Sequence, residues 1–315
     1  MDAKQIAILL AIAGAAVFLI NQAQPQGEST EFKTWKSTFG IRYESEMENA
    51  YREKIFLENL AKIEAHNSES FITYKMGINQ FTGMTDEEFV QTYLGTIVPS
   101  ENVIEESTQE NGDVSVGDVD WVSQGAVTPI KDQGKCGSCW AFSTTGSLEG
   151  LSKLGFGSLK SFSEQQLVDC SNKYGNQGCN GGLMDNAFKY VKDNGICDES
   201  DYAYVAKQHF KCSVKGGDFK ISGFTDIKNC NDLATGLTGR PISVAVDASN
   251  WSKYSSGVFS NCNTSLNHGV LLVGATDAYW KVKNSWSAKW GESGFIRLAR
   301  GNTCGICNVA SYPNK

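Results

Sequence analysis

Cys139 stands in the segment Gln-Gly-Lys-Cys-Gly-Ser-Cys-Trp, residues 133–140, whose residue types suit nucleophilic catalysis. The residues that follow predict a helix over 138–155, which places the thiol at a helix N-terminus. Unpaired backbone N–H groups there favour a thiolate over a thiol. The backbone N–H of Cys139 and the side-chain amide of Gln133 can both donate to a developing oxyanion. The segment therefore predicts acyl transfer through a thiolate.

A nucleophilic thiol needs a base, and the chain has three histidines. His66 falls in a predicted helix and His209 in a Lys-rich stretch expected to be exposed. His268 begins an apolar strand far downstream of Cys139. Asn284 follows another predicted strand, and its side-chain oxygen can accept an imidazole N–H and fix the orientation of the ring. The residues thus predict a site made of Cys139, His268 and Asn284.

Two other uses of the cysteines compete with this interpretation. Cys136 and Cys139 form a Cys-x-x-Cys pair, which serves redox chemistry where it follows a strand in a βαβ unit. Here a Gly-rich loop precedes the pair. Ten cysteines, none before Cys136, also fit disulfides in an oxidising compartment. Zinc is disfavoured because the chain has only three histidines, so we expect no metal and no cofactor.

The N-terminus predicts export. Residues 6–20 form an apolar run preceded by Lys4, at the long end for a signal-peptide core and short for a spanning helix. Cleavage after Ala23 would give a signal peptide over residues 1–23, with an uncleaved signal anchor as the alternative. The net charge of −7 gives no support to nucleic-acid binding. We expect the protein in the secretory pathway, in a lysosome or other acidic vesicle, or outside the cell.

The rest of the chain divides into a helical part and a later β part. Periodicity predicts helices over 29–67, 138–155, 163–170 and 183–194, with Thr85 as N-cap of another short helix. Strands are predicted over 70–81, 242–246, 268–273, 279–282 and 294–298. The acidic stretch 99–118 reads as an exposed linker open to proteolysis. Helices first and strands second predict an α+β unit with two lobes.

Several segments resemble, in order, those of the papain family of cysteine proteases, nearest to the cathepsin L type. The Cys-Gly-Ser-Cys-Trp run is that family's nucleophile signature, and the match extends over residues 30–313. The other matching segments are 119–121, 125–129, 163–170, 178–182, 241–247, 284–286 and 310–313. The resemblance implies a papain-like fold with a helical left lobe and a β-barrel-like right lobe.

The resemblance also implies the activity and the roles of the site residues. It implies a cysteine endopeptidase made as a zymogen, with Cys139 as nucleophile and His268 as base. Asn284 would orient the imidazole, and Gln133 would be the second oxyanion donor. The alternative is a catalytically inactive homologue that serves as a scaffold or inhibitor protein.

Residues 24–114 resemble the inhibitory propeptide of such zymogens, followed by a peptidase domain over 115–315. One helical face carries the interspersed propeptide pattern, in the order Glu48, Arg52, Phe56, Asn59, Ile63 and Asn67. Gly77-x-Asn79-x-Phe81 resembles the next propeptide motif, but Gly83 stands where the family has Asp. In related zymogens that Asp contributes to acid-triggered processing, so the difference bears on the pH of activation.

Three disulfides follow from the resemblance: Cys136–Cys179, Cys170–Cys212 and Cys262–Cys304. Cys139 then remains as the free nucleophile. A fourth bridge between Cys197 and Cys230 is our hypothesis, which leaves Cys307 as an unpaired, buried thiol.

The resemblance further predicts the substrate-binding residues. Apolar residues and Gly would line the pocket for the residue two before the cut: Leu183, Met184, Ala248, Leu266, Gly269 and Val309. Such a pocket should favour Leu, Phe or Val and reject charge. Gly137, Gly181 and Gly182 would let the substrate backbone approach closely. Trp286 would lie beside them and shield the imidazole hydrogen bond from water.

No inserted loop blocks the expected cleft, so we predict endopeptidase rather than exopeptidase action. We also expect a monomer. Expected partners are protein and peptide substrates, the chain's own propeptide and cystatin-type inhibitors. The stretch 273–279 is shorter than in many cathepsin L relatives and predicts a tight hairpin, on which the alignment of His268 with Asn284 depends. Asn250 and Asn263 begin possible glycosylation sequons.

Overall fold

The computed structural model describes residues 28–99 and 117–315. By its contacts the chain falls into two compact units, residues 1–57 and residues 58–315. The predicted signal peptide over 1–23 lies outside the described residues, as does most of the predicted linker over 99–118.

In the first unit, a short helix precedes the start of a longer one. α2 (Thr30–Phe39) begins at Ser29, whose hydroxyl accepts a hydrogen bond from the Phe32 backbone, and ends at Gly40 with a left-handed φ of 67°. α3 (Glu46–Ser68) begins after this break. The helix predicted over 29–67 is therefore two helices. A cluster of three aromatic rings, with centroids 5.1 to 5.5 Å apart, forms the core of this unit: Phe32, Trp35 and Phe56.

In the second unit, asparagine side chains from the end of α3 hold the turns that follow it. Asn59 Nδ2 donates to the carbonyl oxygens of Thr82 and Met84 at 2.8 and 2.9 Å. Asn67 Nδ2 donates to the Met76 carbonyl oxygen at 2.8 Å, and its side-chain oxygen accepts from the Met76 N–H at 3.0 Å. The two asparagines of the propeptide pattern thus hold backbone polar groups that would otherwise lack partners.

The strand predicted over 70–81 is much shorter in the structure. β1 (Tyr74–Met76) pairs with β5, and residues after Met76 turn away from the sheet. α4 (Asp86–Tyr93) then begins as predicted: the Thr85 hydroxyl accepts from the Glu88 N–H, and the Glu88 carboxylate accepts from the Thr85 N–H. A cap of this kind contributes about 1 kcal/mol to a helix of this length.

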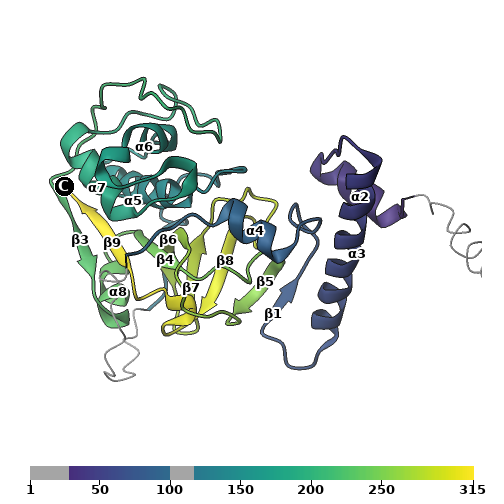
Figure 1. Ribbon diagram of the computed structural model, residues 1–315. Helices are drawn as coiled ribbons and strands as arrows, with labels where there is room; N and C mark the ends of the chain where they lie inside the picture. Colours follow the sequence, from purple (N-terminus) through teal and green to yellow (C-terminus); the bar gives the residue numbers. More distant parts are fainter. Residues whose placement is uncertain (1–27, 100–116) are drawn as a thin grey trace, which may run out of the picture. The chain divides into compact units, whose positions relative to one another are not determined.

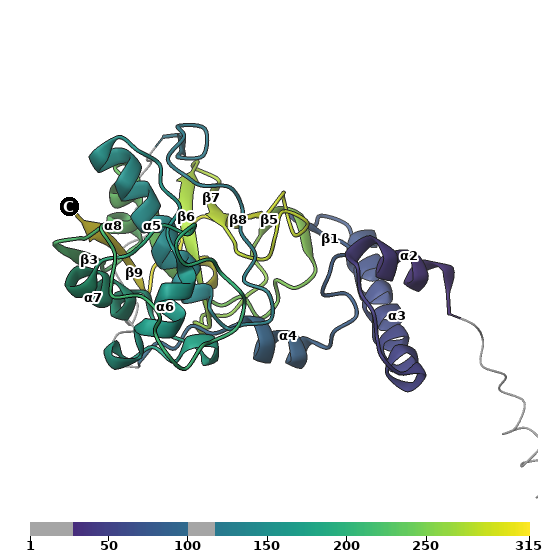
Figure 2. The same ribbon diagram turned by 90° about the horizontal axis from the view of Figure 1, so that it is seen from above.

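The predicted helical lobe is formed by α5 (Cys139–Phe156), α6 (Glu164–Cys170) and α7 (Met184–Asn194), with short 3₁₀ turns at Asn172–Tyr174 and Gly178–Asn180. The three helices lie together in both views (Figures 1 and 2), and α5 packs against strand β6. Ser163 caps α6 through a hydrogen bond from the Gln166 N–H. Apolar side chains of these helices form a core of their own around Trp140, Leu148 and Phe188.

Across the described residues, nine strands form one open, mostly antiparallel sheet in the order β1-β5-β8-β7-β6-β4-β9-β3, with β2 beside β6. The remaining strands are β2 (Val119–Asp120), β3 (Gly223–Ile227), β4 (Ile242–Val246), β5 (Tyr254–Phe259), β6 (His268–Ala275), β7 (Tyr279–Lys283), β8 (Phe295–Ala299) and β9 (Ala310–Asn314). A second core around Trp251, Trp280 and Trp290 belongs to this sheet. The α+β architecture with two lobes is confirmed, and the barrel-like lobe takes the form of this open sheet.

One helix in the β region was not predicted. α8 (Cys230–Leu237) begins at Asn229, whose side chain accepts from the Asp232 N–H, and a 3₁₀ turn at Thr303–Gly305 precedes β9. The apolar residues of α8, which are Leu233, Ala234 and Leu237, are buried in the core of the β lobe.

The disulfides correct one of our hypotheses. Three bridges form as the resemblance implied: Cys136–Cys179, Cys170–Cys212 and Cys262–Cys304. The fourth was wrong, because Cys230 pairs with Cys307, with a Cα–Cα distance of 5.0 Å. α8 brings Cys230 into the β-lobe core with Cys307, whereas Cys197 follows α7 in the helical lobe and is half-buried and free. Cys139 and Cys197 are the free cysteines of the described residues.

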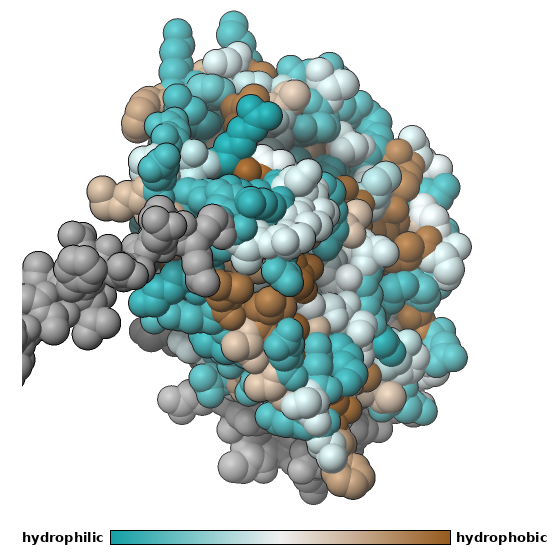
Figure 3. Space-filling model, turned by 90° about the vertical axis from the view of Figure 1, so that its right-hand side faces the viewer, coloured by the Kyte–Doolittle hydropathy of each residue, from teal (hydrophilic) through white to brown (hydrophobic). Residues whose placement is uncertain are grey.

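The surface of the protein is mixed in polarity. On the face shown in Figure 3, hydrophobic side chains form separate patches among hydrophilic ones. Within residues 28–99 and 117–315, no helix is long and apolar enough to cross a membrane.

The predicted hairpin between β6 and β7 is tight: the Thr276 N–H donates to the Tyr279 carbonyl oxygen at 2.9 Å.

Candidate active site

Cys139 is the first residue of α5 and is fully buried. Its backbone N–H therefore has no partner within the helix and is available to an incoming oxygen. Burial would raise the pKa of the thiol, but the His268 imidazole, aided by hydrogen bonds from the Gly269 backbone and Thr96, lowers that pKa to about 7. A thiolate is thus accessible near neutral pH.

His268 begins β6, and Asn284 follows β7, the neighbouring strand of the sheet. His268 Nε2 and Asn284 Oδ1 lie 2.8 Å apart, and this amide oxygen also accepts from the Ser285 N–H at 2.8 Å. His268 Nδ1 is buried and has no nitrogen or oxygen partner among the described residues, and the imidazole lies within hydrogen-bond reach of the Cys139 thiol. The short hairpin therefore aligns the imidazole with Asn284.

Aromatic rings enclose the imidazole. Trp286 stacks on His268 with ring centroids 4.6 Å apart, and Trp251 lies edge-on at 6.1 Å. Trp286 is itself fully buried, because Phe81 and Phe89 pack edge-on against it at 5.4 and 5.1 Å. Trp286 thus covers the imidazole that bonds Asn284, and both of these residues are buried.

Gln133 is held with its amide nitrogen facing the cleft. Its Oε1 accepts from Ser285 Oγ at 2.7 Å and from Trp286 Nε1 at 3.1 Å, which leaves Nε2 as the donor. That nitrogen donates to the carbonyl oxygens of Tyr93 and Cys136, each at 2.9 Å. A backbone carbonyl from the N-terminal segment, that of Tyr93, therefore already accepts a hydrogen bond from this amide nitrogen.

Residues 93–97 run through the cleft beside Cys139. The Gly182 N–H donates to the Gly95 carbonyl oxygen and the Ile97 N–H donates to the Gly182 carbonyl oxygen, both at 2.9 Å, in a parallel bridge around Thr96. Thr96 Oγ1 lies 3.4 Å from Cys139 Sγ. No local pattern in the sequence marks Thr96, because its contact with Cys139 depends on how the segment crosses the two lobes.

The predicted glycines line this passage. A Cβ on Gly95 would lie 2.0 Å from the Gly137 carbonyl oxygen, and a Cβ on Gly181 would lie 2.6 Å from the Gly95 carbonyl oxygen. Only glycine allows two backbones this close. Gly182 and Gly269 also face the segment, through the bridge to Thr96 and a spacing of 3.0 Å from a Cβ on Gly269 to Thr96 Oγ1.

The residues predicted to line the pocket for the residue two before the cut lie mostly together. Leu183, Met184 and Val309 belong to one buried cluster, against which Leu266 packs. A Cβ on Gly269 would lie 3.2 Å from Met184 Sδ. Ala248 belongs to the other core but is tied to the strand next to Leu266 through a hydrogen bond from its N–H to Asn267.

The redox alternative is excluded by the bridge from Cys136 to Cys179, which leaves Cys139 without a partner thiol in the Cys-x-x-Cys pair. Among the described residues, no cluster of three or more His, Cys, Asp or Glu could hold a metal ion.

Comparison with known proteins identifies the class of protein. A family model described as papain family cysteine protease matches residues 116–314, and one described as cathepsin propeptide inhibitor domain matches residues 32–89. The chain therefore belongs to the papain family of cysteine proteases and carries the family's inhibitory propeptide domain. This is the organisation of a cysteine endopeptidase made as a zymogen, inhibited by its own propeptide.

Its relatives include cathepsins L. Cathepsin L 2 of Paramecium tetraurelia is 44% identical over 308 residues, covering 95% of this chain and 98% of the relative. Cathepsin L of Sarcophaga peregrina is 44% identical over 315 residues, covering 90% and 92%. The solved structure of digestive procathepsin L 3 of the Tenebrio molitor larval midgut is similar with a TM-score of 0.79 and 40% identity, covering 90% of this chain and 98% of that one.

Proposed function

We propose that the processed enzyme cleaves peptide bonds through Cys139, His268, Asn284 and Gln133. The observation that carries this proposal is the 2.9 Å hydrogen bond from Gln133 Nε2 to the Tyr93 carbonyl oxygen, three residues before Thr96, whose hydroxyl lies 3.4 Å from the Cys139 sulfur. A donor that already binds a backbone carbonyl in the cleft can bind the oxyanion that forms from a substrate carbonyl.

The chemistry follows from these positions. The Cys139 thiolate attacks the substrate carbonyl carbon, and the C–S bond forms while the carbonyl oxygen becomes an oxyanion held by Gln133 and the Cys139 N–H. The His268 imidazolium gives its proton to the leaving amine as the C–N bond breaks, which leaves a thioester. His268 then takes a proton from water as the water oxygen attacks the thioester. The acid leaves, and the thiolate–imidazolium pair is restored.

From the same contacts we infer why the propeptide stays uncleaved while it is bound beside Cys139. A reacting carbonyl carbon must lie about 3 Å from both the nucleophile and the oxyanion donor. Here the Tyr93 carbonyl faces Gln133, whereas the Thr96 side chain faces the Cys139 sulfur. Because Tyr93 and Thr96 are not adjacent in the chain, no single peptide bond lies against both Gln133 and the Cys139 sulfur.

The propeptide and peptidase segments are also joined by an ion pair. Asp86, in the propeptide match, accepts from Lys253 Nζ at 2.6 Å and from Lys62 Nζ at 3.3 Å. Partial burial would raise the pKa of Asp86, but Lys253 and Lys62 bring it below its ordinary 3.8. A carboxyl with a lowered pKa stabilises the docked form above its ordinary pKa, and this contribution is lost as the pH falls through the lowered value. At pH 5 the pair is therefore intact and opposes release of the propeptide.

The Asp86→Asn variant should therefore activate more readily at pH 5. We expect self-processing to be about 2- to 5-fold faster than in the wild type, because a partly exposed ion pair contributes up to about 1 kcal/mol. The measurement is the rate of conversion of zymogen to mature enzyme on a gel. Glu87→Gln is the control, since Glu87 is an exposed acidic residue of the same helical turn. Equal rates for Asp86→Asn and the wild type at pH 5 would show that the Asp86 ion pair does not hold the propeptide in place.

The pocket around Met184 supports a preference for a bulky apolar residue two before the cut. Its residues are apolar or glycine, and a charged side chain buried there would lack a partner. We expect kcat/KM for a fluorogenic Leu-Arg amide to exceed that for the matching Glu-Arg amide by roughly 100-fold, equal to about 2.7 kcal/mol. Comparable values for the two peptides would show that this pocket does not select the substrate.

We also propose where the protein is found in the cell, how it is processed and what it binds. Residues 1–23 would direct the chain into the secretory pathway, and its four disulfides suit an oxidising compartment, a lysosome or another acidic vesicle included. Residues 24–114 would be removed to leave a peptidase over 115–315. We further propose that the mature enzyme is a monomer and binds cystatin-type inhibitors in the same cleft.

A further inference from the structure

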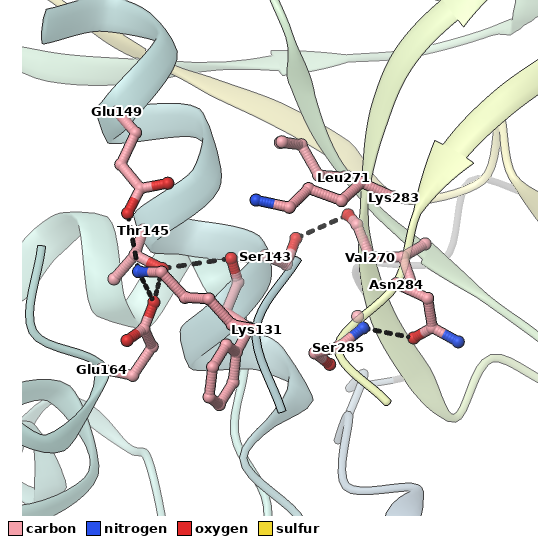
Figure 4. Close-up of a pocket in the computed structure, with 12 residues that line it drawn as sticks. Lys131, Ser143, Thr145, Glu149, Glu164, Val270, Leu271, Lys283, Asn284 and Ser285 are labelled. Carbon is pink, nitrogen blue, oxygen red and sulfur yellow. Dashed lines mark hydrogen bonds and ion pairs between the residues drawn. The ribbon is translucent and has the colours of Figure 1, made fainter. Parts of the chain in front are cut away.

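A buried, charged cavity lies behind the proposed active site. It has a volume of about 20 Å³, and Figure 4 shows it between α5 on one side and Val270 of β6 and Asn284, the residue after β7, on the other. Four charged side chains line it, together with Asn284 and Ser143: Lys131, Glu149, Glu164 and Lys283. None of the four takes part in the proposed chemistry.

On the helix side of the cavity the charges are paired. Lys131 Nζ donates to Glu149 at 2.8 Å and to Glu164 at 2.6 Å, and Figure 4 shows the ammonium group between the two carboxylates. Thr145 Oγ1 donates to the same oxygen of Glu164 at 2.6 Å. Both Glu149 and Thr145 belong to α5, the helix that begins with Cys139.

On the strand side a lysine is buried without an ion pair. Lys283 is 8% exposed, and in the described part of the chain no carboxylate lies within ion-pair distance of its Nζ. The only hydrogen bond of this Nζ within the described residues is to Thr128 Oγ1 at 2.9 Å. Burial, opposed by Glu149 and Glu164, lowers the pKa of this ammonium group to about 8. Such a residue is expected to cost stability rather than to contribute it.

Thr128 joins the two sides. Its hydroxyl donates to Glu149 Oε2 at 2.5 Å and accepts from Lys283, so a continuous chain of polar contacts runs from β7 to α5. The loop that carries Thr128 and Lys131 continues to Gln133, and Lys283 is the residue before Asn284 in the chain. The chain of contacts therefore touches the segments that carry Cys139, Gln133 and Asn284.

We propose that Lys283, through Thr128 and Glu149, is a positioning residue that holds Asn284 at hydrogen-bond distance from His268. The inference rests on the proposed function, because it gives Lys283 a role only if Asn284 orients the imidazole. Neighbouring strand contacts set the backbone of Asn284: its N–H donates to the Gly294 carbonyl oxygen at 3.0 Å. The hydrogen bond of Lys283 adds a fixed point on the opposite, helical side.

The test is the Lys283→Met variant, compared with Lys281→Met as a matched control. Lys281 lies on the same strand but is only half-buried, and its ion pair is with Asp120 at 2.9 Å, away from the cavity. For Lys283→Met we expect an unchanged or higher Tm, a kcat about 10-fold lower and a KM within about 2-fold of the wild type. A displacement of 1 Å in an active site can cost about 100-fold, so a smaller shift fits a 10-fold loss. Lys281→Met should keep its kcat.

A wild-type kcat in a folded Lys283→Met variant would overturn the proposal. If that variant folds poorly, Thr128→Val breaks the same chain of contacts with a side chain of similar shape, and it must lower kcat in the same way. The rate of Cys139 alkylation by iodoacetamide at pH 5 provides a readout without peptide turnover. It should fall in Lys283→Met and not in Lys281→Met, whereas equal rates would overturn the proposal. An inactive wild type that still shows this difference would contradict the proposed function alone.

Discussion

The Cys139→Ala variant is expected to hydrolyse a peptide amide at least about 10⁴-fold more slowly than the wild type, measured as kcat after processing. In the wild type, the Cys139 thiol is fully buried, and His268 lowers its pKa to about 7. This thiol is the group at the α5 N-terminus that can attack a carbonyl. Alanine leaves the fold of α5 unchanged and removes only this group. Wild-type enzyme added in trace amounts can process the variant, so that both are compared as mature proteins.

The chain offers a matched control for this experiment. Cys197 is the other free cysteine of the described residues, it is half-buried, and burial raises the pKa of its thiol. Cys197→Ala should therefore keep the wild-type kcat. Substantial hydrolysis by Cys139→Ala, or an equal loss in both variants, would mean that the nucleophile lies elsewhere.

The Gln133→Glu variant is expected to lose about 10²- to 10³-fold in kcat, with little change in KM. The substitution preserves the size of the side chain and the acceptor that binds Ser285 and Trp286. It replaces the donor that faces the Tyr93 carbonyl with an acceptor oxygen. An oxyanion would then meet a lone pair or a negative charge instead of an N–H group, so the loss should appear in the transition state and not in binding.

Gln124→Glu serves as the control for this change, because Gln124 is exposed and the substitution adds the same charge at the surface. It should leave kcat unchanged. A Gln133→Glu enzyme whose kcat stays within a few fold of the wild type would show that Gln133 is not the second oxyanion donor. Enzyme concentrations must come from titration with an irreversible thiol-directed inhibitor, so that misfolded protein is not counted.

Much of the site could be predicted from the sequence because its residues lie in short local motifs. Cys139 and Gln133 share one segment, and His268 and Asn284 begin or follow strands whose alternation is clear. The caps of α4 and α6 are local too, since each joins residues three positions apart. Local signals of this kind need no knowledge of the tertiary structure.

The errors concern contacts made between distant parts of the chain. α8 was missed because eight residues, with only three buried apolar positions, give a weak periodic signal inside a β region. Without α8, nothing in the sequence distinguishes Cys307 from Cys197 as the partner of Cys230. The strand over 70–81 was too long in the prediction because only Tyr74–Met76 finds a partner strand.

The cavity behind the site was equally hidden. Alternation along 279–283 gives Lys281 and Lys283 the same appearance, that of two charged residues on a solvent-facing side. In the structure Lys283 is buried against the helical lobe, and Lys281 pairs with Asp120 at the edge of β2. Burial of a lysine depends on what the other lobe places over it, and a strand pattern carries no such information.

The most direct test of the account is the hydrolysis of a fluorogenic Leu-Arg amide by the wild-type chain before and after exposure to acid, with the mass and N-terminus of the product determined. We predict no hydrolysis by the intact chain, because residues 93–97 lie against Cys139 and Gln133. We predict strong hydrolysis once a product beginning near residue 115 appears. Full hydrolysis by the intact chain, or none by a folded product that lacks residues 24–114, would contradict it.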